Sequence, residues 1–262
     1  MKTYLTLSAI ALAATAVLSS TGAIAEEAAA PVPDIAVTSN VGITSDYRFR
    51  GISQNDRKVS FQGGFDVAFK QGFYLGTWGS NVSQWTATNG SVEVDLYGGY
   101  KTEIGGVALD IGAINYNYPG NTSYSTTSEA YVGLGYGPAT FKTSYVLSKN
   151  YFASTGGNDA SGTAYFDLSL AQEIAPKLTA VAHAGYTAYK DKQYVNYSTT
   201  GKFSYADYNV GLTYDLNGFV FGAKYYWNSL KAGTKDYANA TSTNGKSDLG
   251  ANGFAVSLTR SF

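Results

Sequence analysis

The chain has 262 residues, no cysteine and a formal net charge of −1 at pH 7. This length allows one large β domain or two small ones. The lack of cysteine excludes a disulfide framework, and the near-neutral charge gives no basic surface that would recommend nucleic acid as a partner. Glycine (30), tyrosine (23) and phenylalanine (13) are frequent, and this composition is typical of strands and turns rather than helices.

The N-terminus has the three parts of a secretory signal peptide. Lys2 precedes the apolar run from Leu5 to Leu18, and Ala23-Ile24-Ala25 has the small-x-small pattern that a signal peptidase cuts. The apolar run is shorter than the roughly 20 residues of a membrane-spanning helix. We therefore predict a cleaved signal peptide over residues 1–25, a short periplasmic segment over 26–34 and a folded domain over 35–262.

Apolar and polar residues alternate over most of this domain, and a period of two is that of a β-strand. In the first run, one face carries Val37, Val41, Ile43, Tyr47 and Phe49, and the other carries Asn40, Thr44, Asp46, Arg48 and Arg50. Similar alternation recurs from Val59 and from Val92. Further strands are predicted over 73–82, 107–118, 128–136, 139–149, 163–172, 178–189, 203–216, 219–228 and 253–262, which makes twelve in all. The strand at 107–118 needs a bulge if Asp110 and Asn115 are to share a face.

The connections between these strands alternate in length. Every second connection is a short turn, at Gln71-Gly72, 103–106, Gly137-Pro138, 173–176 and Asn217-Gly218, and these are turn-forming residues. The other connections are polar and mostly longer. Short turns at one end and long loops at the other predict an antiparallel up-and-down barrel.

Assigning faces by parity puts nearly every charged residue of a strand on one side. In a soluble barrel that side would face water, and the alternation alone allows this reading. Two features favour a membrane instead: twelve strands enclose more space than apolar side chains can fill, and apolar-face aromatics gather near both strand ends, as in the girdles of a membrane barrel. The upper girdle would contain Tyr47, Phe49, Phe61, Tyr186, Tyr225 and Trp227, and the lower one Phe69, Tyr100, Tyr136, Phe141, Phe219 and Phe262.

The predicted fold is thus an all-β transmembrane barrel in the bacterial outer membrane, with short periplasmic turns, longer extracellular loops and lipid as its surroundings. The polar face would line the lumen. The predicted pore-lining residues are Asp46, Arg48, Arg50, Asp66, Glu93, Asp95, Glu129, Lys142, Asp167, His183, Asp207 and Lys224.

Three blocks of sequence carry a family resemblance: "NVGITSDYRFRGISQ" at 40–54, "QGGFDVAF" at 62–69 and "GFYLGTWGSNV" at 72–82. They resemble the TorF-type family of proposed outer-membrane porins, a conserved proteobacterial family of unknown function. The resemblance implies an outer-membrane location and a channel role, and it supplies no catalytic residues. The terminal Phe262 resembles the signal that the barrel-assembly machinery reads, although Arg260 stands where that signal usually has an apolar residue.

The sequence offers little for catalysis or metal binding. His183 is the sole histidine and parity places it in the lumen, where it could not serve as the base of a lipid-edge phospholipase. One histidine and no cysteine also make a poor zinc site. We expect no catalytic residues, no metal and no cofactor.

The predicted function is passive diffusion of ions or small polar solutes through a narrow charged lumen. Arg48 and Arg50 would face acidic residues such as Asp66 and Glu93 across a constriction, or these charges would pair into ladders that stabilise a filled interior. The alternative function is that of a closed barrel with a structural or surface-interaction role through its extracellular loops, such as the one at 229–252.

Overall fold

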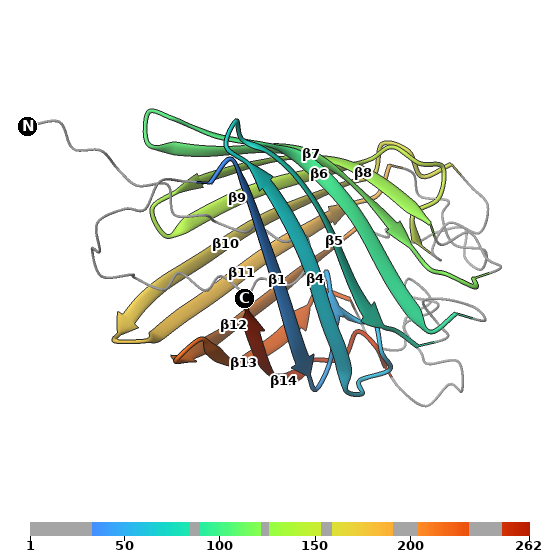
Figure 1. Ribbon diagram of the computed structural model, residues 1–262. Helices are drawn as coiled ribbons and strands as arrows, with labels where there is room; N and C mark the ends of the chain where they lie inside the picture. The colour runs from blue at the N-terminus through green and yellow to red at the C-terminus, as the bar shows by residue number, and fades with distance from the viewer. Residues whose placement is uncertain (1–32, 84–89, 122–125, 153–158, 191–203, 231–247) are drawn as a thin grey trace, which may run out of the picture.

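The computed structural model describes residues 33–83, 90–121, 126–152, 159–190, 204–230 and 248–262. Its twelve long strands form one closed antiparallel barrel, in which each strand pairs with its neighbours in the chain and β1 closes against both β4 and β14 (Figure 1). The barrel strands are β1 (Ile35–Thr44), β4 (Ser60–Phe69), β5 (Phe73–Asn81), β6 (Val92–Ile104), β7 (Val107–Asn117), β8 (Thr127–Tyr136), β9 (Ala139–Val146), β10 (Ala164–Ala175), β11 (Leu178–Ala188), β12 (Tyr205–Leu216), β13 (Phe219–Asn228) and β14 (Gly253–Ser261). The predicted twelve-stranded up-and-down barrel is confirmed. Within the described ranges, no helix has the length and apolar character needed to cross a membrane.

Tight turns connect the strands at one end of the barrel, on the left in Figure 1. Asn217 and Gly218 have φ angles of 54° and 84° between the paired residues Leu216 and Phe219. Two successive positive φ angles define the turn that best matches the twist of the flanking strands. Both ends of the barrel chain meet at this end, because the backbone N–H groups of Ser39 and Phe262 each donate to the other residue's carbonyl.

The outer surface of the barrel is apolar. Phe61 and Phe65 on β4 are 67% and 63% exposed, and the apolar-face residues of the other strands are also exposed or half-buried. Arg260 is the one charged residue that parity places on this face, and it lies beside the β12–β13 turn at the end of the barrel that has the tight turns. Its Nη1 donates to the carbonyl of Asn217 at 3.0 Å, and its guanidinium lies over the ring of Phe219, so its charge reaches past the apolar surface.

The first strand is shorter than its sequence pattern predicts. β1 ends at Thr44, and the chain then turns inward as a small hairpin of β2 (Arg48–Phe49) and β3 (Ile52–Ser53). The prediction that Tyr47 and Phe49 belong to the upper aromatic girdle is therefore wrong, since only 1% and 8% of their surfaces are exposed. They alternate with charged residues because a hairpin inside the barrel has the same period of two as a wall strand.

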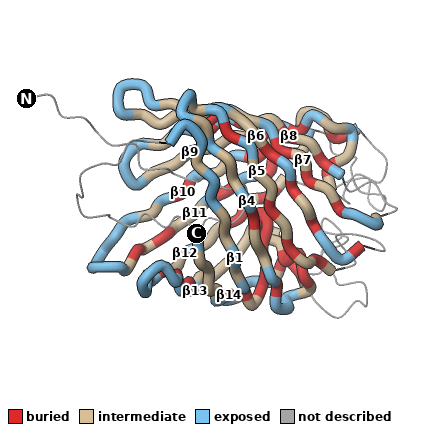
Figure 2. The backbone as a smooth tube through the Cα atoms, viewed as in Figure 1, coloured by how far each residue is buried: buried red, intermediate tan, exposed pale blue. Residues whose placement is uncertain are grey.

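Most of the buried residues lie in the half of the barrel toward the long connections (Figure 2). A buried cluster joins the hairpin to the wall formed by β5–β8, and it consists of Tyr47, Phe49, Tyr74, Trp78, Val82, Tyr97, Ile114, Tyr116, Tyr118 and Tyr131. Strand β7 contains no bulge, so Asp110 and Asn115 do not share a face. β7 pairs in continuous register with β6 and β8, so that Asp110 points inward and Asn115 points outward, where its Nδ2 donates to the hydroxyl of Ser128.

Candidate functional site

The inner hairpin is the central feature of the lumen. Its two strands pair Arg48 with Ser53 and Phe49 with Ile52, which leaves Arg50 and Gly51 as a two-residue turn. Their φ angles of 48° and 79° are those of the turn that matches a hairpin's twist, and glycine adopts such an angle without steric cost. The sequence "FRGI" thus places the Arg50 side chain at the tip of the hairpin.

Arg50 joins the hairpin tip to the far side of the barrel. Its Nη1 and Nη2 donate to the two carboxylate oxygens of Glu129 on β8, at 2.9 and 2.7 Å. Nη1 also donates to the hydroxyl of Tyr151 at 2.6 Å. Tyr151 lies in the connection between β9 and β10, and burial raises the pKa of its hydroxyl, which keeps the phenol neutral. A bidentate arginine–carboxylate pair is among the strongest and most directional contacts of a protein.

Aromatic rings enclose the Arg50 side chain. The guanidinium carbon lies 4.2 Å from the ring centre of Tyr165 on β10 and 4.7 Å from that of Phe49, within the range of cation–π attraction. The hydroxyl of Tyr205 on β12 donates to the backbone carbonyl of Arg50 at 2.9 Å. The hairpin tip is therefore held by residues of β8, β10 and β12, on the wall across from β1.

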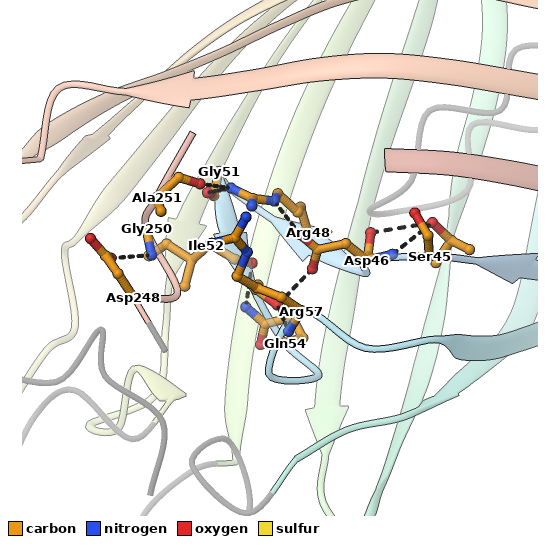
Figure 3. Close-up of polar contacts among 12 residues, drawn as sticks. Ser45, Asp46, Arg48, Gly51, Ile52, Gln54, Arg57, Asp248, Gly250 and Ala251 are labelled. Atoms are coloured by element: carbon orange, nitrogen blue, oxygen red, sulfur yellow. Dashed lines mark hydrogen bonds and ion pairs between the residues drawn. The ribbon is translucent and has the colours of Figure 1, made fainter. Parts of the chain in front are cut away.

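A second set of contacts fixes the base of the hairpin (Figure 3). Arg48 Nε donates to Asp46 Oδ2 at 2.7 Å and Nη1 donates to the carbonyl of Ala251 at 2.7 Å. The other oxygen of Asp46 accepts a hydrogen bond from the Ser53 hydroxyl at 2.6 Å, and the backbone N–H of Ser53 donates to the carbonyl of Leu249. Asp46 and Arg48 thus tie both hairpin strands to the segment that precedes β14.

The close approach of Gly51 to the wall makes hairpin docking testable. A Cβ atom at Gly51 would lie 2.6 Å from the Cβ of Asp207 on β12. We expect Gly51→Val to lower the free energy of unfolding by about 2–4 kcal/mol, because valine is strained at positive φ and overlaps Asp207. Urea-induced unfolding from lipid vesicles, followed by tryptophan fluorescence, measures this change.

Gly105 provides the matched control for this substitution. It also has a positive φ, 61°, but it lies in the turn between β6 and β7, where a Cβ atom would meet nothing within 4 Å. Gly105→Val should cost only the backbone strain, about 1–2 kcal/mol. Equal losses for the two variants would contradict tight docking of the hairpin tip.

His183 lies at the centre of a separate polar cluster on β10, β11 and β12. Its Nδ1 is 3.4 Å from Asp167 Oδ2 and its Nε2 is 3.0 Å from Asp207 Oδ1. The Ser169 hydroxyl donates to Asp167 Oδ1 at 2.7 Å, and the Tyr165 hydroxyl donates to Asp207. The sequence pattern predicts that His183, Asp167 and Asp207 lie in the lumen, and the fold brings the three together.

Ser169, His183 and Asp207 are linked in the order of a hydrolytic triad, because Ser169 Oγ lies 3.2 Å from His183 Nδ1 and His183 Nε2 lies 3.0 Å from Asp207 Oδ1. A serine nucleophile requires a base with a free acceptor nitrogen. Here Asp167 lies 3.4 Å from the same nitrogen, Nδ1, and accepts the serine proton at 2.7 Å, while Nε2 faces Asp207, so each imidazole nitrogen has a carboxylate as a neighbour. This geometry favours an ion-pair cluster over a catalytic centre.

The remaining predicted residues lie on the inner face in other arrangements. Asp66 accepts a hydrogen bond from the Tyr97 hydroxyl at 2.7 Å, and the Lys142 ammonium lies 4.0 Å from the ring centre of Tyr131. Glu93 and Asp95 point inward from β6, and Lys224 points inward from β13 opposite Gly211. That any of these residues lines a conducting path stays a prediction.

Sequence reasoning missed the inward tyrosines. Tyr74, Tyr97, Tyr116, Tyr131, Tyr165 and Tyr205 are buried inside the barrel and contribute rings or hydroxyl groups to the polar clusters. Parity contains this signal, because Tyr97 shares the face of Glu93 and Asp95. The prediction of lumen residues considered charged side chains and His183, so it did not include these tyrosines.

The fold and the interior define a closed twelve-stranded antiparallel barrel with an apolar exterior, a polar lumen and an inserted hairpin. The chain belongs to the Gcw_chp family, described as bacterial proteins of unknown function, which matches residues 25–262. The TorF name that the sequence suggested is not confirmed, and the search of curated proteins found no match.

Solved porin structures share this fold. The KdgM porin superposes with a TM-score of 0.50 at 9% sequence identity, over 87% of this chain and 99% of that one. The NanC porin superposes with a TM-score of 0.52 at 12% identity, over 86% of this chain and 99% of that one. At these identities the similarity shows the fold alone.

Proposed function

We propose that this protein is a bacterial outer-membrane porin that lets ions and small polar solutes diffuse through a narrow charged lumen. The inner hairpin, residues 45–59, forms the constriction. No chemical step and no cofactor take part. Short turns face the periplasm and the long connections face the outside.

One observation carries this proposal: the barrel is apolar outside and charged inside. Phe61, Phe65 and the other exposed apolar residues suit hydrocarbon, and a closed barrel satisfies its backbone hydrogen bonds without water. Charged side chains such as Arg50 and Glu129 would be out of place in a purely structural apolar core. The porin folds of KdgM and NanC support the same interpretation.

The charges inside the barrel favour some solutes over others according to the charge of the solute. One KdgM structure is a complex with disordered oligogalacturonate, an acidic oligosaccharide. In the present chain the wall of β4–β8 carries five carboxylates, Asp66, Glu93, Asp95, Asp110 and Glu129, against one inward lysine of its own, Lys101, and Arg50 of the hairpin, which pairs with Glu129. This acidic wall would repel a polyanion, so we propose small neutral or cationic solutes and ions rather than acidic oligosaccharides.

The closed-barrel alternative keeps one specific observation in its favour. The Arg50–Glu129 pair fastens the hairpin across the lumen, and a permanent fastening would close the path. In that case the function would lie in the long connections. The partner-binding segment predicted at 229–252 falls mainly on residues 231–247, outside the described residues.

Single-channel recording in planar lipid bilayers tests the proposal. The purified, refolded protein is expected to give discrete and reproducible current steps, and its folded state is checked by altered gel migration of the unboiled sample. A salt gradient across the bilayer reads ion preference, and the acidic wall predicts a preference for cations. A folded, inserted barrel that carries no current would overturn the porin proposal and favour the closed barrel.

A further inference from the structure

Glu93 and Asp95 on β6 stand out among the buried charges. They are two residues apart on one strand, so both side chains project from the same face into the lumen. Glu93 is 1% exposed and Asp95 is 0% exposed. Both carboxylate oxygens of Asp95 and Oε2 of Glu93 are buried without a hydrogen-bond partner. Such atoms are rare in folded proteins and commonly mark an ion or water that belongs there.

No basic side chain in the described part of the chain neutralises this pair. The salt bridges among the described residues involve neither Glu93 nor Asp95, and Arg50, the guanidinium at the hairpin tip, is bound to Glu129. The Tyr118 hydroxyl donates to Glu93 Oε1 at 3.3 Å, and the Tyr47 hydroxyl also faces this carboxylate. Both hydroxyls are neutral, so they add no counter-charge. Buried carboxylates without counter-charge are costly, and each of the two raises the cost of the other.

We propose that Glu93 and Asp95 bind a divalent cation of the calcium type inside the barrel. Two carboxylates supply a charge of −2, which one divalent cation balances. Their oxygens are hard ligands of the kind that Ca²⁺ prefers over nitrogen or sulfur. No cluster of three or more His, Cys, Asp and Glu side chains suited to a metal occurs in the described residues. Water, hydroxyl or backbone oxygens therefore complete the coordination.

The site lies between the hairpin and the wall of β5–β8. Asp95 pairs in register with Trp78 on β5 and with Tyr116 on β7, and both belong to the buried cluster that contains Tyr47 and Phe49 of the hairpin. A cation bound there would stabilise the wall against which the hairpin packs. Binding is independent of whether the lumen conducts, so the proposal succeeds or fails separately from the porin proposal.

The neighbouring Trp78 gives the site an optical readout. Tb³⁺ accepts the same oxygen ligands as Ca²⁺ and emits when a nearby indole is excited. The full mature protein, folded in detergent micelles and treated with a chelator, is titrated with Tb³⁺ until equilibrium at each step. We expect saturable sensitised emission that Ca²⁺ displaces, and a higher melting temperature in Ca²⁺ than in chelator.

Isosteric amides identify the ligands. Glu93→Gln and Asp95→Asn should each weaken Tb³⁺ binding by more than about tenfold, since even changes outside the ligand shell cost 10–100-fold at metal sites. The double variant should lose saturable emission and the Ca²⁺-dependent rise in melting temperature. Asp215→Asn is the matched control, because this half-buried carboxylate lies at the opposite end of the barrel, where it accepts a hydrogen bond from the N–H of Gly218 in the turn after β12. Its Tb³⁺ titration should match that of the parent protein.

Two results would overturn the proposal. One is a folded parent protein that shows neither saturable emission nor a Ca²⁺-dependent melting temperature, because the two carboxylates would then be held by protons alone. The other is unchanged Tb³⁺ affinity in the folded double variant, which would show that the ion binds at another part of the protein. The first test needs no variant, so a variant that fails to fold leaves it intact.

Discussion

Replacing residues 45–59 with a two-residue Asn-Gly connection is expected to raise the single-channel conductance several-fold. Thr44 and Ser60 already face each other in the register of β1 and β4, so a short connection can join the two strands directly. The replacement removes Tyr47, Phe49 and Arg50 from the lumen while every pairing of the barrel wall remains. The barrel should therefore still close, with a wider polar path through it.

The current is measured in planar bilayers beside the parent protein at the same salt concentration. A useful control replaces the same residues with an equally long Gly-Ser segment, which keeps the chain length and removes the hairpin's contacts. We expect this control to give larger and noisier currents than the parent, because the segment has no fixed position. Identical conductance in all three proteins would show that the constriction lies elsewhere than at the hairpin.

The strands of the barrel could be predicted from sequence because two local signals agree. The wall of a membrane barrel requires alternation, since each strand has one face to lipid and one to the lumen. Tight turns such as Asn217-Gly218 require residues that tolerate positive φ. Both requirements act within a few residues, so most strand ends were predicted to within three residues.

The inner hairpin could not be predicted in the same way. Tyr47 and Phe49 alternate with Asp46, Arg48 and Arg50 as they would in a wall strand, and a period of two does not distinguish burial in lipid from burial in a packed lumen. The turn at Arg50-Gly51 is a local signal, but it also occurs within a polar stretch that suits a loop. What decides the fold of this segment is packing against residues far away in the chain.

The polar clusters depend on the same long-range information. Arg50 and Glu129 are 79 positions apart, and Asp207 reaches His183 only because β11 and β12 are neighbours in register. Parity correctly sends these side chains inward. It does not specify how far each lies along the barrel axis, and that position decides which charges pair and which, such as Asp95, stay without a partner.

Arg50→Ala is expected to lower the free energy of unfolding by about 3–5 kcal/mol and to increase the current. The substitution leaves Glu129 charged, buried and without its bidentate partner, and the loss of one member of a buried ion pair costs about this much. It also frees the hairpin tip from β8, so that the hairpin leaves the lumen more often. Urea unfolding from vesicles measures the first effect, and bilayer recording measures the second.

A double-mutant cycle that combines Arg50→Ala with Glu129→Gln separates the energy of the ion pair from the energy of the packing around Arg50. Removal of both charges leaves no uncompensated carboxylate, so the double variant should be more stable than the sum of the two single losses allows. Lys58→Ala is the control in the same segment, because the exposed Lys58 ammonium lies 3.4 Å from Asp56 and surface pairs contribute at most about 1 kcal/mol. Additive losses in the cycle would show that Arg50 holds the hairpin through the rings of Tyr165 and Phe49 rather than through Glu129.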